Sequence, residues 1–119
     1  MSNEKMKQPK TAMEDGETLI SSDAGRIIFP FLGAQAGRVF LTTKRVFHES
    51  LMEKITREVK LADIANATIE SAGFTIAQLG IFGFFMKCTT IYQKNGNKMK
   101  FTSRNNQGWI IAIKEALKA

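Results

Sequence analysis

Two hydrophobic periods follow one another along this chain, and their order restricts the fold more than any other feature. Up to about residue 102, apolar and polar residues alternate in short runs, as in strands with one buried face. Beyond Asn105 or Asn106, either of which can cap a helix, the spacing becomes helical. The helical apolar stripe consists of Trp109, Ile110, Ala112, Ile113, Ala116 and Leu117. Because 119 residues suffice for one core, we expect a mainly β domain closed by one terminal helix.

About seven strands are expected, separated by turn signals. They lie at 18–29, on either side of a turn at 42–45, at 55–61, at 64–73, at 85–93 and at 97–102. Gly25 predicts a bend or bulge in the first strand. Pro30, Gly33 and Gly37 interrupt the next stretch and predict a loop over 30–37.

The dipeptide Asn-Gly at 95–96 is the strongest hairpin signal in the chain, and it allows two registers. A two-residue turn places Tyr92 on the same face as the other apolar residues of the pair. A three-residue loop with the glycine as bulge residue pairs Gln93 with Asn97 and buries Ile91 instead. We favour the second register, because it buries the aliphatic side chain and leaves the tyrosine hydroxyl in water.

The ends and the charge of the chain bear on where the protein works. Residues 1–15 are polar, contain Pro9 and contribute nothing to the net charge of +6, so they predict a flexible N-terminal arm before a domain at 16–119. The longest apolar run, at 79–86, is shorter than the ~20 residues of a membrane-spanning helix. No secretory signal precedes the domain, and Cys88 has no second cysteine to pair with. We therefore expect a cytoplasmic protein, with peripheral membrane contact as an option for its basic folded part.

Several short segments occur in an order and at a spacing typical of one domain family. They are 17–20 (ETLI), 37–47 (GRVFLTTKRVF), 59–64 (VKLADI), 91–96 (IYQKNG), Phe101 and 104–110. Together they resemble a GRAM domain of the pleckstrin-homology-like superfold. The resemblance implies a partly open, seven-stranded antiparallel barrel or sandwich capped by a C-terminal helix. It also implies binding of lipid headgroups or proteins without catalysis or a cofactor, and it makes Lys44 and Arg45 structural positions at a turn.

Basic residues are the first candidates for a binding surface. The last two expected strands and their flanks carry Lys87, Lys94, Lys98, Lys100 and Arg104, with no acidic residue between positions 87 and 104. Arg26 and Arg38 flank the first loop. These side chains are candidate contacts for anionic lipid headgroups or an acidic protein. The alternative is that the lysines only line a solvent-exposed edge strand and prevent it from pairing with strands of other molecules. Three or four cations together contribute a binding free energy of ~3–4 kcal/mol at an anionic surface. This corresponds to a dissociation constant only in the millimolar range.

Apolar loops are the second candidates for a binding surface, because burial of their side chains adds binding free energy that the charged residues alone do not supply. They lie at 29–32 and 81–85 and include Phe31, Leu32, Ile81, Phe82 and Phe84. Such side chains can enter a membrane interface, form a homo-oligomer contact or fold back over the mouth of the barrel.

Catalysis, metal binding and nucleic-acid binding receive little support. His48 and Cys88 are the only residues of their types, and neither has a second ligand at metal spacing. We expect Cys88 to be a packed small hydrophobe and His48 to be a surface strand residue. Tyr92 is the single candidate for stacking on a base. The sequence thus predicts a non-enzymatic module that binds an anionic membrane lipid or an acidic protein. The alternative is an assembly domain that self-associates through its apolar loops.

Overall fold

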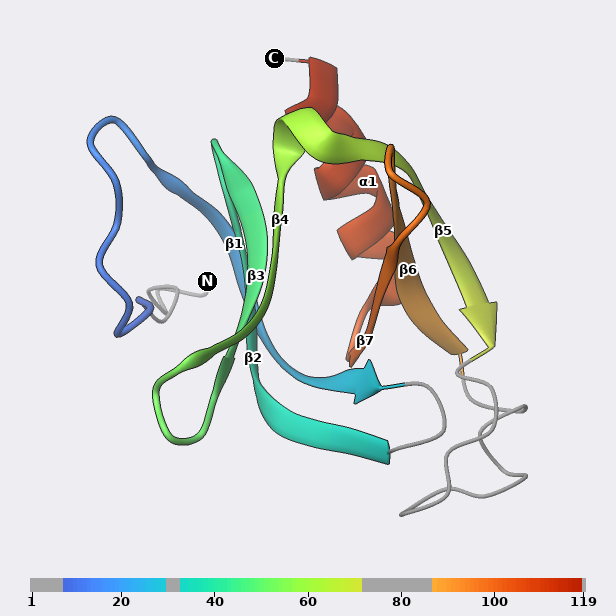
Figure 1. Ribbon diagram of the computed structural model, residues 1–119, viewed down its shortest axis with the longest axis horizontal. Coiled ribbons are helices and arrows are strands. Elements are labelled where there is room, and N and C mark those ends of the chain that lie inside the picture. Colours follow the sequence, from blue (N-terminus) through green and yellow to red (C-terminus); the bar gives the residue numbers. More distant parts are fainter. Residues whose placement is uncertain (1–7, 30–32, 72–86, 119) are drawn as a thin grey trace.

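The computed structural model describes residues 8–29, 33–71 and 87–118. These residues form seven antiparallel strands in one sheet, a short 3-10 helix and a C-terminal helix (Figure 1). The elements are β1 Leu19–Phe29, β2 Gly33–Thr42, β3 Arg45–Ser50, β4 Ile55–Lys60, η1 Leu61–Asp63, β5 Ile64–Ser71, β6 Lys87–Gln93, β7 Lys98–Ser103 and α1 Asn106–Lys118. The sheet curls into a half-barrel whose concave side holds α1. The expected mainly β fold with one closing helix is confirmed.

The strand order in space is β4-β3-β2-β1-β7-β6-β5. Strands β1 to β4 each pair antiparallel with the next strand in the sequence, and so do β5 to β7. The two halves join where β1 pairs with β7, with Ile27 opposite Phe101. At the other side, η1 connects β4 directly to β5. This topology places the beginning of β6, the end of β7 and the middle of β1 at one end of the barrel (Figure 1).

The two predicted hairpin turns are present. The first lies between Thr42 and Arg45, and the second has the three-residue form. In the second turn the Gln93 amide donates to the Asn97 carbonyl at 2.8 Å, and Gly96 has a φ of 92°. Ile91 is buried and Tyr92 lies outside the core, as expected, and the Tyr92 hydroxyl donates to the carboxylate of Glu70 on the neighbouring strand β5.

The loop predicted at residues 33–37 and a bulge at Gly25 are both wrong, for one physical reason. Residues 33–37 belong to β2 and not to a loop, and the irregularity in β1 lies between Leu19 and Ser21, not at Gly25. Gly25 and Gly37 face each other across β1 and β2. A Cβ on Gly25 would lie 2.2 Å from the Thr102 carbonyl oxygen, and one on Gly37 would lie 2.1 Å from that of Glu49. These glycines permit close approach of strands and do not mark turns.

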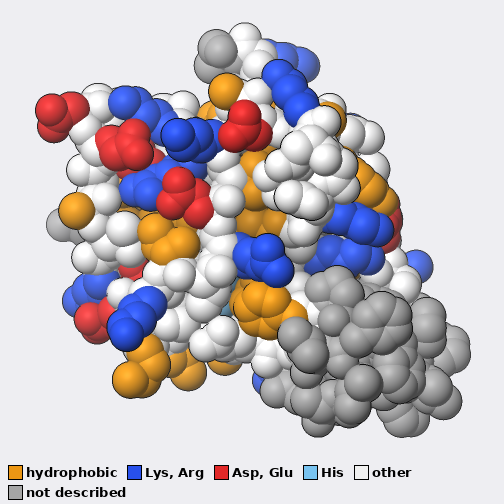
Figure 2. Space-filling model, viewed as in Figure 1, with side chains coloured by type: hydrophobic (Ala, Val, Ile, Leu, Met, Phe, Trp, Pro, Cys, Tyr) orange, Lys and Arg blue, Asp and Glu red, His pale blue; other side chains and the backbone are white. Residues whose placement is uncertain are grey.

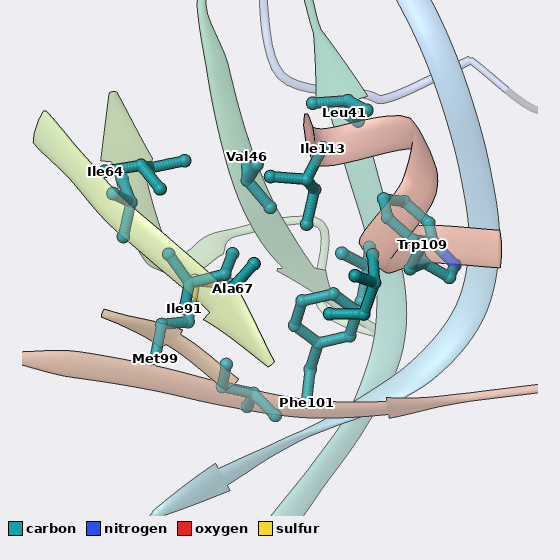
Figure 3. Packing of buried hydrophobic residues seen from close by; sticks show 13 residues of the cluster. Leu41, Val46, Ile64, Ala67, Ile91, Met99, Phe101, Trp109 and Ile113 are labelled. Carbon is teal, nitrogen blue, oxygen red and sulfur yellow. The ribbon is translucent and has the colours of Figure 1, made fainter. Parts of the chain in front are cut away.

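The helix closes the core from the concave side of the sheet. The Asn105 side chain caps it by accepting from the Gly108 amide at 2.9 Å. Trp109 meets Phe101 edge to face, with ring centroids 5.4 Å apart. Figure 3 shows Trp109 and Ile113 pointing into the sheet, toward the side chains of β3 and β7. The apolar stripe predicted from the helical spacing therefore faces the core, except for Leu117, which is 37% exposed.

The convex side of β2 and β3 carries a second buried pair. Phe40 and Phe47 alternate with the core residues of their strands and stack with centroids 5.2 Å apart. Residues 10–17 are bonded to this part of the sheet. The Glu49 carboxylate accepts from the amides of Lys10 and Thr11 at 3.0 and 2.8 Å. A flexible arm over residues 1–15 and a domain boundary at residue 16 stay predictions.

Candidate anion-binding surface

The candidate basic residues lie in two separate places. On the outer face of β6 and β7, the Lys98 ammonium lies 5.6 Å from the centre of the Tyr92 ring, and Lys94 is exposed in the hairpin. Lys100 lies on β7, and its side chain reaches across β6 to β5, where its ammonium donates to the Ser71 carbonyl at 3.0 Å and lies 3.8 Å from a Glu70 oxygen. Its side chain is only 14% exposed. Lys100 is therefore paired with an acidic residue, Glu70, which lies on β5 and so outside the segment 87–104.

The second group surrounds an open hollow of about 460 Å³ at the end of the barrel where β7 stops. Its lining comprises Ala24, Gly25, Arg26, Ala36, Gly37, Lys87, Thr102, Ser103 and Arg104. The three cations come from β1, from the first residue of β6 and from the residue after β7, and the β1–β7 register brings these segments together. No acidic residue is among the described residues that line it.

The three cations of the hollow differ in their partners. Arg26 and Lys87 are exposed and form no ion pair within the described part of the chain. Arg104 bonds to Asp23 at 3.4 Å, yet its side chain is 83% exposed. Gly25 and Gly37 contribute backbone only, so no side chain of theirs fills the hollow. A site of this kind attracts an anion through charges that are open to solvent.

The other first-loop candidate, Arg38, does not line the hollow. It lies on β2 opposite Ala24 and Glu49, and its Nε is buried without a hydrogen-bond partner among the described residues. The nearby Glu49 carboxylate is already engaged by Lys10 and Thr11.

The predicted apolar contacts Phe31, Leu32, Ile81, Phe82 and Phe84 lie outside the described residues. The structure shows a different apolar pair, Leu51 and Met52, in the turn between β3 and β4. Sequence reasoning missed this pair, although two consecutive large apolar residues after Ser50 break the alternation of the strand and are a signal of exposure.

Arg45 is a structural residue and not part of a binding surface. It is buried, its guanidinium bonds to Glu17 at 2.8 and 3.1 Å and to Glu58 at 3.0 Å, and it lies over the Phe47 ring. Burial favours the neutral form of Glu17, but hydrogen bonds from Arg45, from Thr42 and from a backbone amide outweigh burial and lower its pKa to about 2. The structural role that the resemblance implied for Arg45 is confirmed.

We expect the fold to lose stability in acid because of such carboxylates. The pKa of Glu17 is about 2 in the folded state against an ordinary 4.5, so its contribution is complete above pH 4.5 and disappears as the pH falls toward 2. The difference corresponds to about 3 kcal/mol. The pKa of Glu49 is also lowered: burial opposes this shift, but hydrogen bonds from Lys10 and Thr11 outweigh it. Urea unfolding at pH 7 and pH 3 measures the effect. A Glu17→Gln variant should show a flatter pH dependence, and equal unfolding free energies of the wild type at both pH values would contradict the prediction.

His48 and Cys88 are both buried, and each side chain is bonded to other partners in the described part of the chain. His48 is fully buried, contrary to the expectation of a surface residue, because it faces the concave side beneath Gly37. Its Nδ1 lies 2.5 Å from the Thr56 hydroxyl and its Nε2 lies 3.2 Å from the Gly25 carbonyl. Cys88 is buried as expected, with its thiol near the Ser71 carbonyl and the Thr90 hydroxyl. Burial lowers the pKa of His48 and raises that of Cys88, which favours the neutral form of both. In the described ranges no three metal-binding side chains cluster.

Comparison with known proteins was made on sequence and on structure. Neither a protein-family model nor a curated protein matches the sequence. The N-terminal PH domain of Vps36 superposes with a TM-score of 0.62 at 17% identity, over 91% of this chain and 87% of that one. The chain has a pleckstrin-homology-like fold.

Other solved structures share the pleckstrin-homology-like fold with this chain. The C-terminal domain of an unknown protein from Leishmania infantum has a TM-score of 0.65 at 12% identity, over 88% of each chain. The linker-DH/PH domains of p115-RhoGEF have a TM-score of 0.59 at 10% identity, over 87% of this chain and 30% of that one. At these identities the similarity concerns the fold. None of the described helices has the length and hydropathy needed to span a membrane.

Proposed function

We propose that this pleckstrin-homology-like domain is of the GRAM type and acts as a non-catalytic module that binds an anionic membrane surface. The observation that carries the proposal is the hollow at the end of the barrel. Arg26, Lys87 and Arg104 reach it from three distant segments, and no described acidic residue lines it. Such a group of exposed cations matches the phosphate groups of lipid headgroups.

The other lysines face a different direction. Lys94 and Lys98 lie on the β6–β7 hairpin, whose turn is at the opposite end of β7 from the hollow (Figure 1). A flat membrane surface can therefore contact either the cations of the hollow or the lysines of the hairpin, but not both at once. We assign the contact to the hollow, because its cations converge and the hairpin lysines do not.

The proposal is tested by sedimentation with phosphatidylcholine vesicles that contain or lack phosphatidylserine. We expect salt-sensitive binding to the anionic vesicles, and a loss of at least tenfold in the variant Lys87→Glu/Arg104→Glu, since each cation contributes ~1 kcal/mol and reversal adds repulsion. The matched control Lys94→Glu/Lys98→Glu makes the same change in net charge at the other end of the domain. Its binding to the anionic vesicles should fall much less.

Two results would count against the membrane assignment. Equal losses in both variants would show that only net charge matters. Absence of binding at low salt would leave an acidic protein as the partner that the same cations fit. Self-association through the loops at 29–32 and 81–85 stays a prediction, because these loops extend beyond the described residues.

A further inference from the structure

The turn between β3 and β4 exposes more apolar side chain than any other described part of the molecule. Leu51 is 76% exposed and Met52 is 77% exposed, whereas the next large apolar residue, Ile111, is 55% exposed. Soluble proteins place single apolar residues on their surface without consequence, but two adjacent ones at a protruding turn have a cost in water.

This exposure belongs to a well-built turn. The Ser50 amide donates to the Lys54 carbonyl at 2.8 Å, and the Glu53 amide donates to the Ser50 carbonyl at 2.9 Å. The Ser50 hydroxyl accepts from the Met52 amide at 3.2 Å. Glu53 adopts a φ of 64°, a conformation that a side chain rarely takes without such support. The backbone under the two apolar side chains is thus already ordered, so binding would cost little further entropy.

Charged residues adjoin the apolar tip in the sequence: the acidic Glu53 lies within the turn, and two cations follow it. Lys54 ends the turn and Arg57 follows on β4, where its guanidinium lies 5.3 Å from the centre of the Phe29 ring at the end of β1. Ser50 pairs with Gly37, which lines the cationic hollow. In the region where Figure 1 places the β3–β4 turn, at the lower left, Figure 2 shows apolar side chains with blue and red side chains above them. Apolar tip, flanking cations and hollow therefore share one end of the domain.

These features fit an anionic bilayer better than a second copy of the chain. Two tips meeting face to face would bring Lys54 and Arg57 of both copies together, a repulsion that the single acid of each turn, Glu53, offsets only in part. Two side chains also offer far less area than the roughly 800 Å² per partner of a stable protein interface. A bilayer interface accepts small apolar wedges and attracts adjacent cations.

We propose that Leu51 and Met52 insert into the interface of an anionic bilayer while Lys54, Arg57 and the cations of the hollow lie at the headgroups. This inference rests on the proposed function and supplies the apolar contribution that charge alone lacks. Because that contribution is insensitive to salt, wild-type binding should fall at high salt but not disappear.

The test is the variant Leu51→Ser/Met52→Ser on vesicles of phosphatidylcholine and phosphatidylserine. We expect a loss of about tenfold to hundredfold in partitioning, from removal of two large apolar side chains. Ile111→Ser, an exposed apolar residue on α1, is the matched control and should bind as the wild type does. A Met52→Trp variant should show a blue shift of tryptophan emission on addition of the vesicles, beyond any change in the wild type.

The outcomes separate this inference from the proposed function. If the wild type does not bind the anionic vesicles, the proposed function fails. If it binds and the serine variant binds equally, the inference fails while the proposed function stands. If light scattering without vesicles shows a dimer that the serine variant lacks, the tip is a contact between copies and the inference is overturned.

Discussion

Replacement of Arg45 by alanine is expected to destabilise the domain by about 3–5 kcal/mol, because it leaves the buried carboxylate of Glu17 without its cation. The Glu17 side chain has no exposure to solvent, and Arg45 itself is only 7% exposed. The same substitution removes the guanidinium contact with Phe47 and the bond to the Ala12 carbonyl. Urea unfolding at neutral pH measures the loss.

Lys44 offers the matched control for this prediction. It is the neighbouring residue, but its side chain is 45% exposed and its nearest carboxylate, that of Glu14, lies 3.9 Å away. Lys44→Ala should change the unfolding free energy by at most ~1 kcal/mol. Combining Arg45→Ala with Glu17→Gln should cost less than the sum of the single changes, since no buried charge then remains alone. A loss below ~1 kcal/mol in Arg45→Ala would contradict the structural role assigned to this pair.

Truncation of Trp109 to alanine is the second change with a large expected effect, again about 3–5 kcal/mol. The indole is buried between α1 and the sheet and contacts Phe101, which lies opposite Ile27 at the seam between β1 and β7. Its loss would leave a cavity where the helix meets the core. Thermal unfolding measured by circular dichroism should show a clearly lower midpoint.

Ile111 lies on the same helix and serves as the control for Trp109. Its side chain is more than half exposed, so Ile111→Ala should cost less than ~1 kcal/mol. Similar losses in both variants would show that helix propensity dominates and that the indole is not a core residue in solution.

Features encoded by neighbouring residues could be predicted from the sequence. The hairpin register at Gly96 follows from one turn dipeptide and the need to bury Ile91, and the helix follows from its spacing and from Asn105. Glycine is ambiguous in the sequence, because the close approach of two strands and a tight turn both require this residue. At Gly25 and Gly37, only the pairing of the strands shows that the glycine permits close approach and does not form a turn.

The candidate site depended on contacts that sequence spacing does not contain. Lys100 is paired because β5 brings Glu70 beside it, and Lys87 and Arg104 join Arg26 only through the pairing of β1 with β7. The residue types were recognised as candidates, but their division into two surfaces needed the sheet order. His48 was misplaced because a lone polar residue in a strand gives no sign of which face it takes.

The sheet order also has a kinetic consequence. Among the described strands, every spatial neighbour is also the next strand in sequence, except for β1 and β7. The turns between β2 and β3 and between β6 and β7 close short loops, whereas the β1–β7 seam joins strands near the two ends of the described domain, so its closure costs more conformational entropy than either turn. The rate-limiting search of this chain is therefore concentrated in one long-range encounter, between Ile27 and Phe101 and their neighbours.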